Sequence, residues 1–274
     1  MQYVTLNNGL TMPQLGFGVW QVPDEEAYTS VKTAIEVGYR SIDTARLYDN
    51  EEGTGRAIAD SGVAREDIFL TTKLWNADHG YDKALKAFDA SLERLGTDYV
   101  DLYLIHWPTP DRDMYVDTWK ALERVYSEGR AKAIGVSNFT AETLERLIGE
   151  SEVTPALNQI ELHPYFSQER MRALNAEKGL RTEAWSPLGQ GKGLLDEPVL
   201  TEIGAAHGKT AAQVVLRWHL RLGNIVIPKS VTPARIRENF DVFDFELTAE
   251  DLERIDGLNR DGRIGPNPDE LNSA

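Results

Sequence analysis

SIDTARLYDNEEG, residues 41–53, sets the pattern for the whole chain, because it joins a strand end, two ionisable side chains and a helix start. Asp43 follows the apolar Ile42 directly, and Tyr48 comes after a short polar segment. A helix is then predicted over residues 51–60. A strand that passes through a polar loop into a helix is typical of one βα unit of a parallel sheet.

Two other β-rich runs also carry an ionisable residue near their ends. IFLTTKLW (68–75) ends just after Lys73, and YVDLYLIHWP (99–108) ends just after His106. A parallel α/β barrel builds its active site at the carboxyl ends of its strands. Asp, Tyr, Lys and His are therefore predicted to converge at one end of a barrel.

The same alternation of strand and helix continues along the chain, which favours a closed (β/α)8 barrel with extra C-terminal helices. Strands are predicted at residues 15–19, 40–43, 68–74, 99–105, 132–136, 156–160, 181–185 and 225–227. Helices are predicted at residues 25–37, 51–60, 81–94, 114–128, 141–149, 167–178, 198–206, 210–222, 233–239 and 248–258.

The two ends of the chain add smaller features. Residues 2–6 and 10–12, joined by Asn7-Asn8-Gly9, predict an N-terminal hairpin that closes the bottom of the barrel. Asp24 is expected to cap the first helix. The tail 261–274, rich in Gly, Pro, Asn and Asp, is either a loop over the barrel mouth or a frayed terminus.

Composition limits the class of protein and its partners. The 274 residues, 41% of them hydrophobic, suffice for one large core, so one domain over residues 1–274 is expected. The formal net charge of −15 argues against nucleic acid and anionic membrane partners. The chain has no cysteine, no leader pattern and no apolar run of membrane-spanning length, so a cytoplasmic location is expected.

A metal site is not expected, because the histidines show no ligand spacing and no cysteine can join them. They stand at His79, His106, His163, His207 and His219. His163, which precedes Pro164, is expected to make a structural hydrogen bond. Gly16 and Gly18 suggest a dinucleotide fingerprint, but position 21 is Gln rather than the third glycine, so a Rossmann domain is excluded.

The four ionisable residues suit proton donation to a carbonyl that receives hydride from a bound cofactor. A free phenol has a pKa near ~10, so Tyr48 needs a cation beside it, and Lys73 is expected to be that cation. Asp43 would supply the counter-charge, and His106 would orient the carbonyl oxygen. A rival chemistry remains open, in which Lys73 forms a Schiff base as in aldolase-type enzymes.

Eight segments in order resemble the aldo-keto reductase superfamily, and within it the bacterial 2,5-diketo-D-gluconate reductases. They are MPQLGFGVW (12–20), GYRSIDTARLYDNEEG (38–53), TTKLW (71–75), DLYLIHWP (101–108), IGVSNF (134–139), NQIELHP (158–164), WSPLGQG (185–191) and IPKS (227–230). The resemblance implies NADPH-dependent reduction of aldehydes and ketones, including keto-sugar acids, by a monomer. Because the superfamily also contains non-catalytic subunits, a nucleotide sensor is the second alternative.

The resemblance also implies which residues hold the cofactor and the carbonyl substrate. The cofactor residues would be Gly18, Val19, Trp20, Asp43, Ser137, Asn138, Gln159, Trp185, Ser186, Leu188, Gly189, Gln190, Gly191, Lys229, Ser230, Val231, Arg235, Glu238 and Asn239. The substrate residues would be Trp20, Tyr48, Trp75, His106 and Trp107. Thr232-Pro233 stands where similar proteins are more basic, so a moderate preference for NADPH is expected, with NADH as a weaker substitute.

Overall fold

Eight parallel strands form the centre of the molecule in this computed structural model, which describes residues 1–273. Neighbouring strands follow the order β10-β9-β8-β7-β6-β5-β4-β3, and a parallel bridge from Leu15 to Val226 joins the two edges. The strands are β3 (Phe17–Gly18), β4 (Ser41–Asp43), β5 (Phe69–Leu74), β6 (Leu102–Ile105), β7 (Ile134–Ser137), β8 (Leu157–Glu161), β9 (Arg181–Trp185) and β10 (Ile225–Val226). The predicted (β/α)8 barrel is confirmed.

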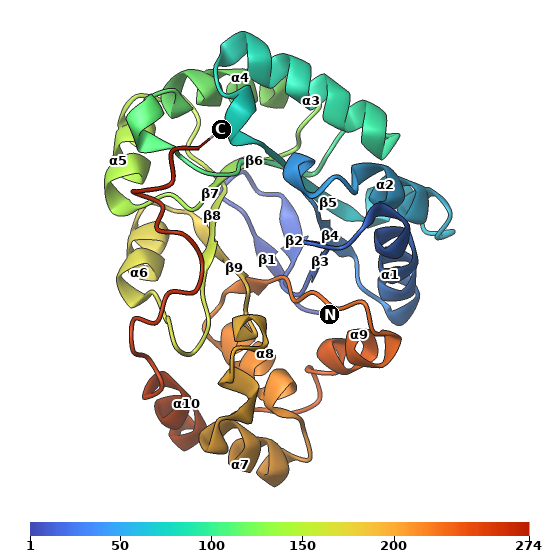
Figure 1. Ribbon diagram of the computed structural model, residues 1–274, viewed down its shortest axis with the longest axis vertical. Coiled ribbons are helices and arrows are strands. Elements are labelled where there is room, and N and C mark those ends of the chain that lie inside the picture. Colours follow the sequence, from blue (N-terminus) through green and yellow to red (C-terminus); the bar gives the residue numbers. More distant parts are fainter. Residues whose placement is uncertain (274) are drawn as a thin grey trace.

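Helices alternate with the strands along the chain and surround the sheet (Figure 1). They are α1 (Asp24–Val37), α2 (Glu51–Ala59), α3 (Tyr81–Leu95), α4 (Tyr115–Ser127), α5 (Ala141–Gly149), α6 (Glu169–Glu177), α7 (Pro198–His207), α8 (Ala211–Arg221), α9 (Pro233–Phe240) and α10 (Ala249–Asp256). The extra helices expected near the C-terminus are therefore present. No helix of residues 1–273 is long and apolar enough to cross a membrane.

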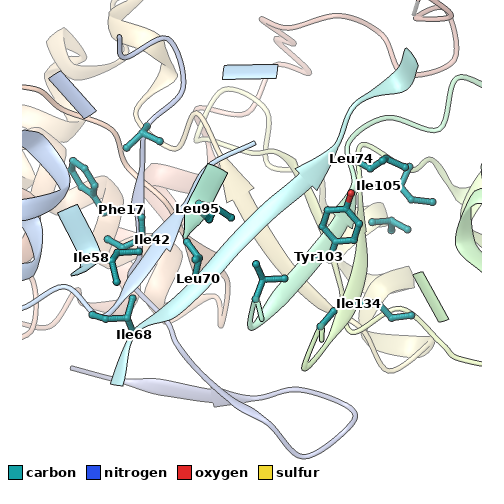
Figure 2. Packing of buried hydrophobic residues seen from close by; sticks show 14 of the residues in the cluster. Phe17, Ile42, Ile58, Ile68, Leu70, Leu74, Leu95, Tyr103, Ile105 and Ile134 are labelled. Carbon is teal, nitrogen blue, oxygen red and sulfur yellow. The ribbon is translucent and has the colours of Figure 1, made fainter. Parts of the chain in front are cut away.

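Side chains that point outward from the strands form the apolar layer beneath the helices. Successive strand residues point to opposite faces, so Ile42, Leu70 and Tyr103 face outward while their neighbours face the barrel axis. Figure 2 shows these three side chains projecting from β4, β5 and β6. Tyr103 packs on Phe88 of α3, with ring centroids 4.7 Å apart. This layer fixes the strands from outside, so interior positions at their carboxyl ends can hold polar residues such as Asp43 and Lys73.

An N-terminal hairpin closes the bottom of the barrel, as the sequence predicts. β1 (Tyr3–Thr5) pairs with β2 (Thr11–Pro13), and the buried Leu6 and Met12 join an apolar cluster with residues at the amino ends of the strands. The Asn7 side chain also donates to the Pro155 carbonyl at 2.9 Å. Chemistry is therefore confined to the opposite end.

The tail that follows α10 runs along one side of the barrel mouth, past α6 and α5 (Figure 1). Ile264 and Gly265 donate their amides to the Glu161 carboxylate, at 2.5 and 2.8 Å, at the carboxyl end of β8. Further along, the Asn76 side chain, just beyond β5, donates to the Ser273 carbonyl at 3.0 Å. Residues 261–273 thus form a loop at the mouth, and position 274 lies outside the described residues.

Two local predictions are wrong. Asp24 does not cap α1 but is its first residue, and its carboxylate accepts the amide of Gly53 in α2 at 2.6 Å. The strand predicted over 99–105 begins only at Leu102. Next to it, the Asp101 carboxylate takes the Leu70 amide at 2.9 Å, a donor that a regular ladder would give to a main-chain carbonyl.

Gly55 of α2 provides a test of how closely the helices pack. A methyl group at Gly55 would lie 2.2 Å from the Leu95 carbonyl oxygen at the end of α3, whereas one at Gly149 of α5 would meet nothing within 4 Å. We expect Gly55→Ala to lower the free energy of unfolding by about 2 kcal/mol or more, because overpacking forces the backbone to shift. Gly149→Ala should be neutral or stabilising by up to about 1 kcal/mol.

Urea unfolding followed by circular dichroism measures both variants. Equal midpoints for the two alanine variants would show that α2 does not depend on the small residue at position 55.

Candidate active site

The carboxyl ends of three neighbouring strands carry most of the predicted catalytic residues. Asp43 is the last residue of β4, Lys73 lies near the end of β5, and His106 follows β6 directly. Tyr48 ends a short 3-10 turn, Arg46–Tyr48, in the loop after β4. These strands are adjacent in the sheet, so the side chains lie at one end of the barrel.

Lys73 and Asp43 form a buried ion pair at the centre of this site. The Lys73 Nζ lies 2.6 Å from Asp43 Oδ1 and also donates to the Thr44 carbonyl at 2.9 Å. Burial favours the neutral amine, but Asp43 and Tyr48 outweigh it, so the pKa of Lys73 is raised. Lys73 therefore remains an ammonium, which is the wrong form for attack on a carbonyl.

Tyr48 lies beside this pair, with the Lys73 Nζ 5.1 Å from the centre of its ring. Burial of the hydroxyl is the largest influence and raises the pKa of Tyr48, while Lys73 lowers it in part. The lysine therefore acts in the direction that the sequence predicts, but the net shift is upward because desolvation is larger. The resting phenol keeps its proton, and the ammonium favours the phenolate that would form when that proton leaves.

His106 faces Tyr48 and Trp75, with ring centroids 5.7 and 5.5 Å apart respectively. Burial, followed by the charge of Lys73, holds the pKa of His106 well below its usual range. The imidazole is therefore neutral at physiological pH. Its Nδ1 is buried and has no hydrogen-bond partner among residues 1–273. An acceptor nitrogen is less costly to leave unpaired there than an N–H donor, so the proton is assigned to Nε2.

Gln159 of β8 connects Asp43 to a residue that the sequence reasoning missed. Its Nε2 donates to Asp43 Oδ2 at 2.9 Å and to Glu183 Oε2 at 2.8 Å. Glu183 of β9 is fully buried. A signal was available, because Glu183 stands two positions before Trp185 on the same strand and must share its inward-facing side.

Asn138, Ser137 and Trp185 form a second polar group next to His106. Asn138 donates to the His106 carbonyl at 2.9 Å and accepts from the indole of Trp185 at 2.8 Å. The Ser137 hydroxyl donates to the Gln159 carbonyl at 2.9 Å. Asn138 has a left-handed backbone, with φ of 63°. Three strand ends, those of β7, β8 and β9, are thereby tied together beside the catalytic candidates.

The other predicted cofactor residues extend from this group in two segments. In the loop after β9, Ser186, Gly189, Gln190 and Gly191 all have positive φ, and Leu188 is partly buried. In the segment from β10 into α9, Lys229 and Arg235 are exposed cations. The ion pairs of residues 1–273 include neither of these two cations. Both segments present main-chain or cationic groups of the kind that bind phosphate.

The remaining predicted residues differ in how accessible they are. Trp20 and Val231 are exposed, at 39% and 38%, whereas Trp107 is only 8% exposed. Buried positions include Val19, Ser230 and Asn239, and Gly18 donates its amide to the Pro228 carbonyl at 3.1 Å. Glu238 accepts the Thr210 hydroxyl at 2.9 Å, at the start of α8.

His163 makes a structural contact, as the sequence predicts. Its Nε2 lies 3.0 Å from Glu161 Oε1, beneath the amides of the C-terminal tail. Within residues 1–273 no cluster of His, Cys, Asp and Glu side chains could hold a metal ion.

The chain is similar to known proteins over almost its whole length. Residues 12–260 match the Aldo/keto reductase family. The chain is 55% identical to a glyoxal reductase of Bacillus subtilis (strain 168), over 98% of this chain and 96% of that one. It is 52% identical to methylglyoxal reductase DkgA of Escherichia coli (strain K12), over 98% and 97% of the two chains. The crystal structure of a Gox0644 mutant in complex with NADPH superposes with a TM-score of 0.95, at 49% identity and over 98% of both chains.

The buried ion pair can be tested through stability. Asp43→Asn should lower the free energy of unfolding by about 3–5 kcal/mol, because it leaves the Lys73 ammonium buried without a counter-charge. The double variant with Lys73→Met should recover most of that loss, since no uncompensated charge remains. As a control, Glu128→Gln, which breaks the solvent-accessible pairs with Arg124 and Arg130, should cost less than about 1 kcal/mol.

Chemical denaturation of the wild-type protein, these three variants and the single variant Lys73→Met gives these values. Additive losses in the double variant would mean that the two charges are not coupled in the folded protein.

Proposed function

The chain belongs to the aldo/keto reductase family, and from that premise we propose that it reduces small aldehydes and ketones to alcohols with NADPH. The observation that carries this proposal is the group formed by Tyr48, Lys73 and His106 at the barrel mouth. A protonated phenol lies beside an ammonium and a neutral imidazole, with the ring distances of 5.1 and 5.7 Å given above. This is the arrangement that protonation of a carbonyl oxygen requires.

In the proposed mechanism, His106 donates its Nε2–H to the carbonyl oxygen and orients it. Tyr48 gives its proton to the same oxygen as negative charge develops there. Lys73 stabilises the resulting phenolate, and Asp43 keeps Lys73 charged. The chain's task is to polarise the carbonyl and to keep the reacting groups in place.

The residues present fit a nicotinamide cofactor. Gln159 donates both of its amide hydrogens to carboxyl groups, those of Asp43 and Glu183. Its amide oxygen can therefore accept a hydrogen bond from another group, such as the carboxamide of nicotinamide. Trp185 offers a ring held by Asn138, and the positive-φ loop from Ser186 offers main-chain amides to phosphate. When bound, NADPH supplies the hydride. Its 2′-phosphate would meet Lys229 and Arg235 at the start of α9.

The names of two relatives support one substrate class. The two curated relatives are named for the reduction of glyoxal and methylglyoxal, which are small dicarbonyls. We propose small dicarbonyls as the first substrates to test, lying among Trp20, Trp75 and His106. Keto-sugar acids such as 2,5-diketo-D-gluconate are the second candidate, and a substrate panel followed by NADPH absorbance separates the two.

Two alternatives from other classes give opposite results in simple assays. A Schiff-base enzyme would form a covalent adduct on Lys73 that borohydride traps, but the raised pKa of Lys73 argues against it. A nucleotide sensor would bind NADPH without turnover. Steady-state oxidation of NADPH by an aldehyde, with no trapped adduct, is the outcome expected here.

We further propose that the chain acts as a cytoplasmic monomer and a single domain over residues 1–274. The net charge of −15 supports the absence of nucleic acid partners. Light scattering of the purified protein tests the monomer.

Tyr48→Phe tests the proton donor. We expect turnover to fall by about 10²–10⁴-fold, because the variant lacks the acidic hydroxyl but keeps the ring. The dissociation constant for NADPH, measured by fluorescence quenching, should change less than about twofold. A variant that retains more than about a tenth of the turnover would contradict the assignment of Tyr48.

Arg235→Ala tests the choice of cofactor. A charged hydrogen bond contributes roughly 1.5–3 kcal/mol, so the wild-type protein should prefer NADPH over NADH by about tenfold or more. Arg235→Ala should weaken NADPH alone. Arg237→Ala, on the same exposed helix, is the matched control and should leave both cofactors unchanged. Equal loss with NADH and NADPH in Arg235→Ala would overturn the proposed phosphate pocket.

A further inference from the structure

Glu183 is a buried carboxyl in the barrel interior for which the proposed chemistry has no use. It lies in the middle of β9, in register with Gln159 of β8 and Ile225 of β10, and it is fully buried. A carboxyl at such a position is costly unless it is paired or neutral. Its retention in the interior, immediately below the residues of the mouth, therefore needs a physical reason.

A single amide nitrogen connects Glu183 to the ion pair. Gln159 Nε2 has two hydrogens and donates one to Asp43 and the other to Glu183, at 2.9 and 2.8 Å. Asp43 is ionised because it pairs with Lys73, so only the nitrogen side of the amide can face it. Glu183 accepts the second hydrogen bond from the same nitrogen. This bond fixes the direction in which the side-chain amide oxygen of Gln159 points.

The charges around Glu183 do not balance if it is ionised. The ionisable neighbours are Asp43 on β4, Tyr48 in the loop after β4, which keeps its proton, and Lys73 on β5. β8 contributes the neutral Gln159, and β10 contributes the apolar Ile225. Lys73 already donates hydrogen bonds to Asp43 and to the main-chain carbonyl of Thr44. Glu183 Oε1 is buried and has no partner within residues 1–273. The site thus contains one ammonium and two carboxyl groups. Lys73 forms its ion pair with Asp43, so Glu183 has no ion-pair partner of its own.

Burial first, and the Asp43 charge second, raise the pKa of Glu183 to about 8. Gln159 and Lys73 act in the opposite direction but are weaker. The carboxyl is therefore mostly protonated at pH 7 and becomes an anion as the pH rises through about 8. Loss of this proton changes the net charge beneath the site within the range in which the protein can be assayed.

We propose that Glu183 is a positioning residue for the nicotinamide, which orients Gln159 and, by gaining negative charge, favours the oxidised, positively charged ring over the reduced, neutral one. This inference rests on the proposed function, since it requires that the ring lies near Gln159. Because coupling between two sites is reciprocal, binding of NADP⁺ promotes loss of the Glu183 proton by the same factor.

The experiment measures dissociation constants rather than activity. Binding of NADP⁺ and NADPH to the wild-type protein is followed by tryptophan fluorescence between pH 7 and 9.5. Both nucleotides carry the same phosphates, so phosphate titration cancels in the ratio of their dissociation constants. A shift of one pKa unit corresponds to a tenfold change in affinity. We expect the ratio of the NADP⁺ constant to the NADPH constant to fall about three- to tenfold as the pH rises.

Two variants separate charge from position. Glu183→Gln keeps an oxygen that accepts from Gln159 but cannot ionise, so its ratio should not change with pH. Glu183→Leu removes the acceptor, so it should weaken both nucleotides by about tenfold at pH 7, an effect that Glu183→Gln should not show. If Glu183→Gln does not fold, Glu183→Asn provides the non-ionising comparison.

The possible results point to different conclusions. The ratio of the NADP⁺ to the NADPH dissociation constant could fall equally with pH in the wild-type protein and in Glu183→Gln, or stay constant in both. Either result overturns the proposal that the charge of Glu183 favours the oxidised ring. Unchanged nucleotide binding by Glu183→Leu overturns the positioning assignment. Failure of the wild-type protein to bind either nucleotide would instead refute the proposed function, and the inference about Glu183 would fall with it.

Discussion

The ion pair between Lys73 and Asp43 is the constraint from which the properties of the site follow. The charged amine of Lys73 is fully buried inside the barrel, 2.6 Å from the Asp43 carboxylate. Its charge lowers the pKa of His106 and opposes the upward shift at Tyr48. Without the ammonium, burial alone would still lower the pKa of His106, and burial would raise the pKa of Tyr48 without this opposition. The roles that we propose for Tyr48 and His106 therefore both depend in part on this one charge.

The two ends of the barrel differ: one is closed by apolar side chains, and the other is open and carries the Lys73–Asp43 ion pair. The hairpin and the apolar cluster around Leu6 and Met12 close the bottom, so the interior polar residues have only one accessible end. Asp43, Lys73 and Gln159 project from strands, whose positions are fixed by ladders on both sides. A site on strands is held more rigidly than one on loops alone, and proton transfer depends on such fixed distances.

A protein with a negative net charge can bind an anionic cofactor only where positive groups lie next to the binding site. The net charge of −15 would repel phosphate at long range. Salt screens such fields within about 8–10 Å, so direct contacts determine affinity. Lys229 precedes α9 and Arg235 lies in its first turn, where main-chain amides have no partner within the helix. These two exposed cations are the groups that we propose bind the anion at short range.

The amino-acid sequence determined the alternation of strands and helices and the end of the barrel at which Asp43, Lys73 and His106 stand. Both follow from periodicity, because apolar patterns fix the element type and parallel strands bring their carboxyl ends together. Long-range packing decided the rest. The Asp24 carboxylate accepts a hydrogen bond from an amide of α2, and burial raises the pKa of the Tyr48 phenol. The side-chain amide of Gln159 links Glu183 to Asp43. These depend on burial and on partners distant in sequence, which a local pattern does not encode.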